Sequence, residues 1–80
     1  MFSSETRIDF GLSVQDALEK WGVSKTEVSA FLLANQYTEV PQSGGTVLYY
    51  GQMANGKRVR IRVRHQGNVA RVLAFLVVGE

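Results

Sequence analysis

The spacing of apolar residues predicts two short amphipathic helices in the first half of the chain. In the first of them, apolar residues recur at intervals of three and four, the period of one helical face, at Val14, Ala17, Leu18 and Trp21. Ser13 can cap the start of this helix, and Gly22 can end it. An apolar face of this kind needs a core to cover it.

A second helix should begin almost at once, because residues 24–27 read Ser-Lys-Thr-Glu. This is a capping box, in which Ser24 and Glu27 satisfy each other's backbone N–H groups. The buried face continues through Val28, Phe31 and Leu32, and the helix should end near Asn35. The pattern therefore predicts two helices joined by a sharp turn.

After Tyr37 the period changes to two, which predicts strands, and three pairs of turn residues punctuate it: Gly44-Gly45, Asn55-Gly56 and Gly67-Asn68. The segment 37–42 should be an edge strand, because Pro41 cannot donate to a hydrogen-bond ladder. Residues 6–10 alternate weakly and can form a short first strand. The second half is therefore a meander of hairpins.

The turns also predict a register. A two-residue loop at Asn55-Gly56 places Tyr50 opposite Ile61, and Tyr49 opposite Arg62. A two-residue loop at Gly67-Asn68 pairs Val63 with Val72, Ile61 with Ala74 and Val59 with Leu76. Both registers together put one set of residues on the core face: Leu48, Tyr50, Val59, Ile61, Val63, Val72, Ala74 and Leu76.

These elements predict a single α+β domain over residues 1–80, with two N-terminal helices packed on one face of a three- to four-stranded antiparallel sheet. The chain has no cysteine and a single histidine, so neither a disulfide framework nor a familiar zinc site is expected. We expect no cofactor. Without a leader pattern or a long apolar segment, we expect a soluble cytoplasmic protein that does not enter membranes.

Charge divides the chain into two unequal parts. Residues 1–56 carry a net charge of −3, whereas residues 57–80 carry +5, almost all of it arginine. Four arginines alternate with apolar residues in the stretch 57–65, Lys-Arg-Val-Arg-Ile-Arg-Val-Arg-His. Arginine is suited to bidentate contact with phosphate or carboxylate, so an anionic partner is indicated.

The predicted register surrounds these arginines with Tyr49, Leu73, Phe75 and Val77 on the face opposite the core. Cationic and aromatic side chains together are typical of surfaces that bind single-stranded nucleic acid, and RNA is the partner we expect. An acidic protein, a second copy of the chain in a homodimer, or solvent alone remain alternatives. The expected nucleic-acid contacts are Lys57, Arg58, Arg60, Arg62, Arg64, Arg71, Tyr49 and Phe75.

Catalytic chemistry is sparse in this sequence, which has no Gly-rich phosphate loop and no Ser-His-Asp set, so the residues leave open whether the protein is an enzyme. If RNA is cleaved, His65 or Tyr49 would transfer the proton, and Arg62 would stabilise charge on the phosphate. His65 lies on the core-face parity of its strand, where a structural role is the alternative.

Residues 17–29, which contain the Gly-Val-Ser turn at 22–24, resemble a helix-turn-helix. The resemblance implies a DNA-binding regulator whose second helix enters the major groove, with Lys25, Thr26 and Ser29 reaching the DNA. This would be a binding function without catalysis.

A second resemblance spans residues 8–78 and depends on short motifs: residues 19–24, Glu-Lys-Trp-Gly-Val-Ser; residues 49–52, Tyr-Tyr-Gly-Gln; and residues 55–59, Asn-Gly-Lys-Arg-Val. In this order they are similar to the BrnT-type small bacterial toxins of the RelE-like ribonuclease group. The resemblance implies two helices on an antiparallel sheet, RNA cleavage on the arginine-bearing face, and a cognate antitoxin. The matching residues are Tyr50, Gly51, Gly56, Arg58 and the strand arginines.

Overall fold

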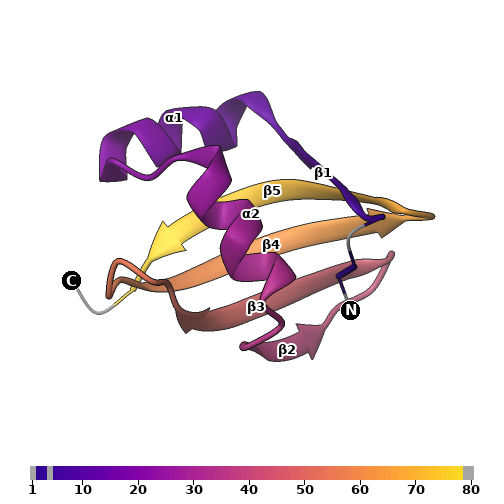
Figure 1. Ribbon diagram of the computed structural model, residues 1–80. Helices are drawn as coiled ribbons and strands as arrows, with labels where there is room; N and C mark the ends of the chain where they lie inside the picture. The colour runs from indigo at the N-terminus through magenta and orange to yellow at the C-terminus, as the bar shows by residue number, and fades with distance from the viewer. Residues whose placement is uncertain (1, 4, 79–80) are drawn as a thin grey trace.

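The computed structural model describes residues 2–3 and 5–78, which form two helices and a five-stranded sheet (Figure 1). In chain order the elements are β1 (Arg7–Phe10), α1 (Leu12–Trp21), α2 (Lys25–Leu33), β2 (Thr38–Pro41), β3 (Thr46–Gln52), β4 (Arg58–Gln66) and β5 (Val69–Val77). The α+β class with two helices on one sheet is confirmed.

The helices follow the sequence pattern closely. The capping box at α2 is present: Glu27 N donates to Ser24 Oγ at 3.0 Å, and Ser24 N donates to Glu27 Oε1 at 2.9 Å. Gly22 ends α1 in the left-handed region with a φ of 67°. The predicted cap at Ser13 is wrong, because α1 begins one residue before it, after an extended Gly11 whose lack of a side chain leaves the helix without a side-chain cap.

The sheet is larger than predicted and is mixed rather than antiparallel. Its strand order is β1-β5-β4-β3-β2, and β1 runs parallel to β5. The two helices carry the chain from one edge of the sheet to the other, so β1 and β2 lie at opposite edges (Figure 1). The segment with Pro41 is an edge strand, as predicted.

The predicted register between β3 and β4 is wrong by one residue. Met53 N donates to Lys57 O, and Gly56 N donates to Met53 O, so the loop contains three residues instead of two. Gly56 has a φ of 87°, whereas Asn55 keeps a negative φ, which is the pattern of a type I turn followed by a bulge. As a result Tyr49 pairs with Ile61, and Tyr50 pairs with Arg60.

Packing explains this register. The shift turns Val47, Tyr49, Gly51 and Met53 toward the helices, a series without a polar strand residue, whereas the predicted series included Gln52. A Cβ at position 51 would lie 2.9 Å from the ring of Phe31, so a glycine is needed where this ring of α2 packs against β3.

The register between β4 and β5 is right at one end and wrong at the other. Val63 pairs with Val72 as predicted, but Ile61 pairs with Phe75 because Leu73 is an extra, bulged residue in β5. Residues 72–77 are apolar throughout, so their pattern could not reveal the bulge. Four residues predicted for the core therefore lie on the other face: Leu48, Tyr50, Ala74 and Leu76.

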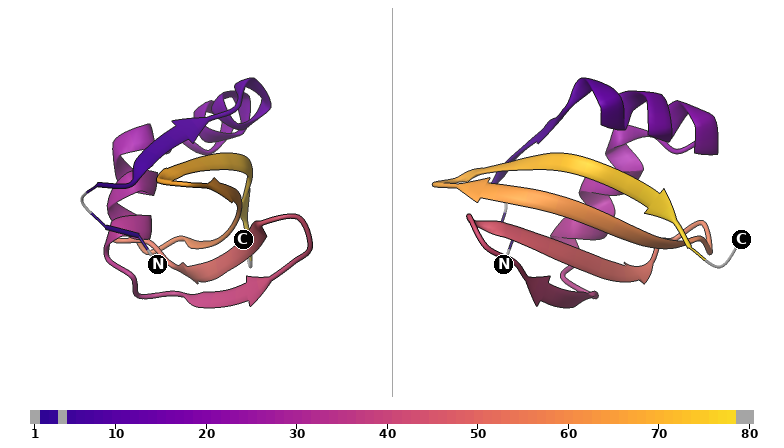
Figure 2. Two further views of the ribbon diagram at one scale, coloured as in Figure 1. Left: turned by 90° about the vertical axis from the view of Figure 1, so that its right-hand side faces the viewer. Right: turned by 180° about the vertical axis from the view of Figure 1, so that it is seen from behind.

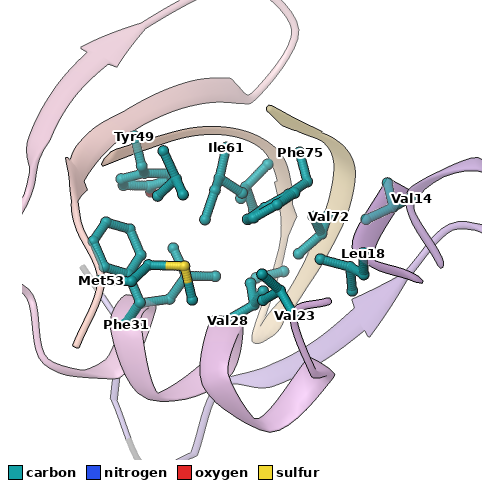
Figure 3. Packing of buried hydrophobic residues seen from close by; sticks show 14 of the residues in the cluster. Val14, Leu18, Val23, Val28, Phe31, Tyr49, Met53, Ile61, Val72 and Phe75 are labelled. Carbon is teal, nitrogen blue, oxygen red and sulfur yellow. The ribbon is translucent and has the colours of Figure 1, made fainter. Parts of the chain in front are cut away.

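The sheet curls around α2, so its helix-facing surface is concave and its other surface is convex (Figures 2 and 3). The concave surface holds the core, in which α2 contributes Val28 and Phe31 and the strands contribute Ile61, Tyr49 and Phe75 (Figure 3). Helix α1 packs along β5 and buries Val14 and Leu18. The convex surface is not covered by any helix of the described chain.

Candidate nucleic-acid interface

The alternation of β4 divides its side chains cleanly between the two surfaces. Val59, Ile61 and Val63 are 0% exposed. Their neighbours in sequence all point to the convex surface and are exposed: Arg58, Arg60, Arg62 and Arg64. Alternate residues of a strand are about 7 Å apart, so the four arginines form a row about 20 Å long.

Apolar side chains of β3 and β5 flank the row. Arg60 lies between Tyr50 and Leu76, and Arg62 lies between Leu48 and Ala74. A shallow hollow of about 280 Å³ lies between these side chains, and Gln42 from the β2–β3 hairpin lines its rim. We call this set of convex residues the arginine face: Leu48, Tyr50, Arg58, Arg60, Arg62, Arg64, Arg71, Ala74 and Leu76.

Three predicted members of this interface lie elsewhere. Tyr49 is 1% exposed and Phe75 is 5% exposed, and both point into the concave core because of the loop and the bulge described above. Lys57 lies in the β3–β4 hairpin, opposite Met53 and off the row. The sequence interpretation missed Tyr50, Leu48 and Leu76, although Gln52, at alternate spacing from Tyr50, is a polar residue that marked this side of β3 as the open one.

The positive charge of the arginine face is not neutralised within the described residues. None of its five arginines forms an ion pair there; the ion pair found joins Arg7 Nε and Asp9 Oδ1 at 3.1 Å. On the convex surface the strands β2 to β5 contribute no acidic side chain, because Glu39 alternates with Thr38 and Val40 and pairs with Tyr49. Asp9 of the edge strand β1 pairs with Arg71, but its carboxylate binds Arg7. The arginine face therefore presents five guanidinium groups that form no ion pair within the described residues.

The structure brings two of the predicted catalytic residues together, but away from the arginine face. Tyr49 Oη and His65 Nε2 are 2.6 Å apart. The ring of Phe2 covers this pair, with its centroid 5.3 Å from both the Tyr49 and the His65 ring. Asn35 fixes the position of Phe2, because its side chain accepts from Phe2 N and donates to Phe2 O.

Both members of the pair favour their neutral forms. Burial lowers the pKa of His65, an effect that the negative charge of Glu39 partly offsets. Burial also raises the pKa of Tyr49 above its ordinary value, and Glu39 adds to the rise. The hydrogen bond therefore joins a neutral phenol and a neutral imidazole inside an aromatic cluster that also includes Tyr37.

Arg62, the third predicted catalytic residue, points to the convex surface, so the sheet separates it from Tyr49 and His65. A phosphate held by Arg62 would lie on the far side of the sheet from both proton-transfer candidates. The arrangement can hold a phosphate group, but it cannot use Tyr49 or His65 to protonate a leaving group there.

The helix-turn-helix residues lie in a hollow rather than on a projecting helix. Val28, Phe31 and Leu32 bury α2 in the concave core. The first turn of α2 lies beside β1, with Lys25 Nζ 5.9 Å from the centroid of the Phe10 ring. Lys25, Thr26 and Ser29 line this hollow together with residues of β1. A helix embedded in this way does not stand clear to enter a major groove.

No group of three or more His, Asp or Glu side chains within residues 2–3 and 5–78 could hold a metal ion. No helix in the described part of the chain is long and apolar enough to cross a membrane. Comparison with protein-family models, with curated proteins and with solved structures finds no match to this chain. Its function must therefore be argued from the site itself.

Proposed function

We propose that this protein binds single-stranded RNA on the arginine face, without cleaving it. The observation that carries the proposal is the row of uncompensated arginines interleaved with Tyr50, Leu48 and Leu76. Repeated positive charge about 7 Å apart suits an extended polyanion, and the apolar side chains between the charges suit its bases.

A nucleic acid fits this surface better than a second copy of the chain. A twofold dimer places the same patch against itself, so five arginines would face five arginines, and the strands β2 to β5 supply no acidic side chain to separate them. Like charges at an interface cost free energy, whereas phosphates would neutralise them and release counterions. The exposed apolar residues then serve a ligand instead of a dimer.

The convex shape favours a single strand over a duplex. A duplex is stiff over distances far longer than this sheet, so it would contact a convex surface over only a short length. A single strand can follow the curve. Tyr50 and the arginine planes offer stacking surfaces for unpaired bases. The Gln42 amide, at the rim of the hollow beside Arg60 and Arg62, can donate to and accept from a 2′-hydroxyl, which favours RNA over DNA.

The toxin endoribonuclease function implied by the RelE-like resemblance is a second candidate. The observation that favours it is the arrangement, in which helices cover one surface of the sheet and arginines occupy the other. Neither Tyr49 nor His65 reaches the arginine face, so cleavage would need a different proton-transfer group. Expression in bacteria separates the candidates: we expect normal growth and intact total RNA, and growth arrest with RNA cleavage would support the toxin function and an antitoxin partner.

Binding is tested with a fluorescent 12-nucleotide RNA and two variants that change the net charge equally. The first variant is Arg62→Glu, at the centre of the arginine face. The second is Lys20→Glu, on the exposed side of α1. We expect Arg62→Glu to weaken binding at least tenfold and Lys20→Glu to change it less than about twofold. Equal effects would mean that only net charge attracts RNA, and would contradict a site on this face.

A further inference from the structure

A second cationic feature lies beside the edge strand β1 and shares one residue, Arg71, with the arginine face. An open hollow of about 640 Å³ lies between β1 and the first turns of α2. Three basic side chains from three different elements line it, namely Arg7 of β1, Lys25 of α2 and Arg71 of β5.

The remaining polar groups of the hollow favour an anion. The hydroxyl groups of Thr26 and Ser29 line it, and neither has a hydrogen-bond partner within the described residues. Asp9 is the one acidic residue of its lining, and Arg7 already binds that carboxylate at 3.1 Å. The hollow therefore has a net positive charge and free donors.

These donors are side chains rather than the end of the helix dipole alone. The capping box already uses Glu27 N through Ser24 Oγ, so part of the first turn of α2 is satisfied. Lys25 Nζ lies 5.9 Å from the Phe10 ring, on the helix side of β1, whereas the register places Arg7 and Arg71 on the convex side. The hollow therefore extends around the edge strand β1, and basic groups from one helix and two strands line it.

The hollow is continuous with the arginine face. Arg71 pairs with Arg64 across β4 and β5, and with Asp9 across β5 and β1. Neighbouring strands are about 5 Å apart, so β1 lies roughly 10 Å beyond the Arg64 end of the row. A strand that follows the row from Arg58 to Arg64 would reach the hollow after a short further step.

We propose that this hollow binds a phosphate group of the same RNA strand, at the point where the strand leaves the arginine face at Arg64. The inference rests on the proposed RNA binding and adds a second subsite to it. Lys25 and Arg71 supply charge, Thr26 and Ser29 donate hydrogen bonds to phosphate oxygens, and the half-buried ring of Phe10 offers a carbon surface to the adjoining sugar or base. The residues that resemble a groove-reading helix thus serve as a phosphate clamp.

The test is NMR of the ¹⁵N-labelled full chain, titrated separately with the 12-nucleotide RNA and with inorganic phosphate. The RNA should shift the signals of residues 58–64 and also those of Thr26 and Ser29. Lys25→Gln should weaken RNA binding about tenfold, whereas Lys20→Gln, the matched change on α1, should leave it within about twofold.

Two results would overturn this inference while leaving the proposed function intact. One is RNA shifts confined to residues 58–64, with equal affinities for Lys25→Gln and Lys20→Gln. The other is shifts of Thr26 and Ser29 with inorganic phosphate but not with RNA, which would make the hollow a separate phosphate site. If RNA shifts neither region, the proposed function itself is wrong, and the inference falls with it.

Discussion

The two surfaces of β4 differ in chemistry although they belong to the same nine residues. On the concave side Val59, Ile61 and Val63 are fully buried beneath α2, and on the convex side the arginines that alternate with them form no ion pair within the described residues. The difference shows that one strand can supply the centre of a core and, on its other side, the centre of the surface for which we propose RNA binding. Substitutions on the concave side should therefore affect folding, and substitutions on the convex side should affect binding.

The sharpest contrast compares two adjacent positions. Ile61→Ala should lower the free energy of unfolding by about 2–5 kcal/mol, because the side chain is 0% exposed and its loss leaves a cavity. Arg62→Ala should change it by less than about 0.5 kcal/mol but weaken RNA binding. Urea denaturation monitored by Trp21 fluorescence measures the free energy of unfolding of both variants. Similar losses of stability for the two variants would mean that the surfaces are not separate in function.

The next prediction concerns the contact that fixes which side of β3 faces the core. Gly51→Ala should cost about 1–3 kcal/mol, because the added Cβ would lie 2.9 Å from the Phe31 ring. Adding Phe31→Leu should remove most of this extra cost, as measured by a double-mutant cycle in urea. A cycle with no coupling energy would contradict the register that places Gly51 beneath α2.

The smallest effect concerns the pH dependence of the concave side. Because burial lowers the pKa of His65 in the folded protein, the unfolded chain takes up a proton at higher pH than the folded one does. The contribution of the neutral His65 to the free energy of unfolding should therefore be fully present above about pH 7. It should fall as the pH decreases toward the lowered pKa of the folded state. His65→Gln should flatten this part of the curve, and identical pH profiles for the two proteins between pH 7 and 5 would contradict the buried, neutral histidine.

Local physics made much of the fold predictable. Ser24 and Glu27 form their capping box within four consecutive residues, and Gly22 ends α1 through its own backbone conformation. Pro41 excludes its strand from the middle of the sheet. The arginine row was also predictable, because a strict alternation with fully apolar residues leaves one assignment of faces. These features need no information from distant parts of the chain.

The errors in the predicted sheet arose where the local sequence fits two backbone arrangements equally well and tertiary packing decides between them. The residues around Asn55-Gly56 fit a two-residue or a three-residue loop, and the contact between Gly51 and Phe31 favours the second. The bulge at Leu73 is hidden in an apolar run, and the parallel pairing of β1 with β5 depends on both helices crossing the sheet. Hence the row of charges was predicted correctly, whereas its aromatic neighbour is Tyr50 instead of Tyr49 or Phe75.

The most direct test of the RNA-binding arginine face is the salt dependence of affinity for the 12-nucleotide RNA. Contacts from five arginines predict that the logarithm of the association constant falls with the logarithm of salt concentration with a slope of about −3.5. Arg60→Gln combined with Arg62→Gln should bring this slope to about −2. A shallow slope for the natural sequence, or a steep one that the double variant leaves unchanged, would show that the arginine face does not hold the phosphates.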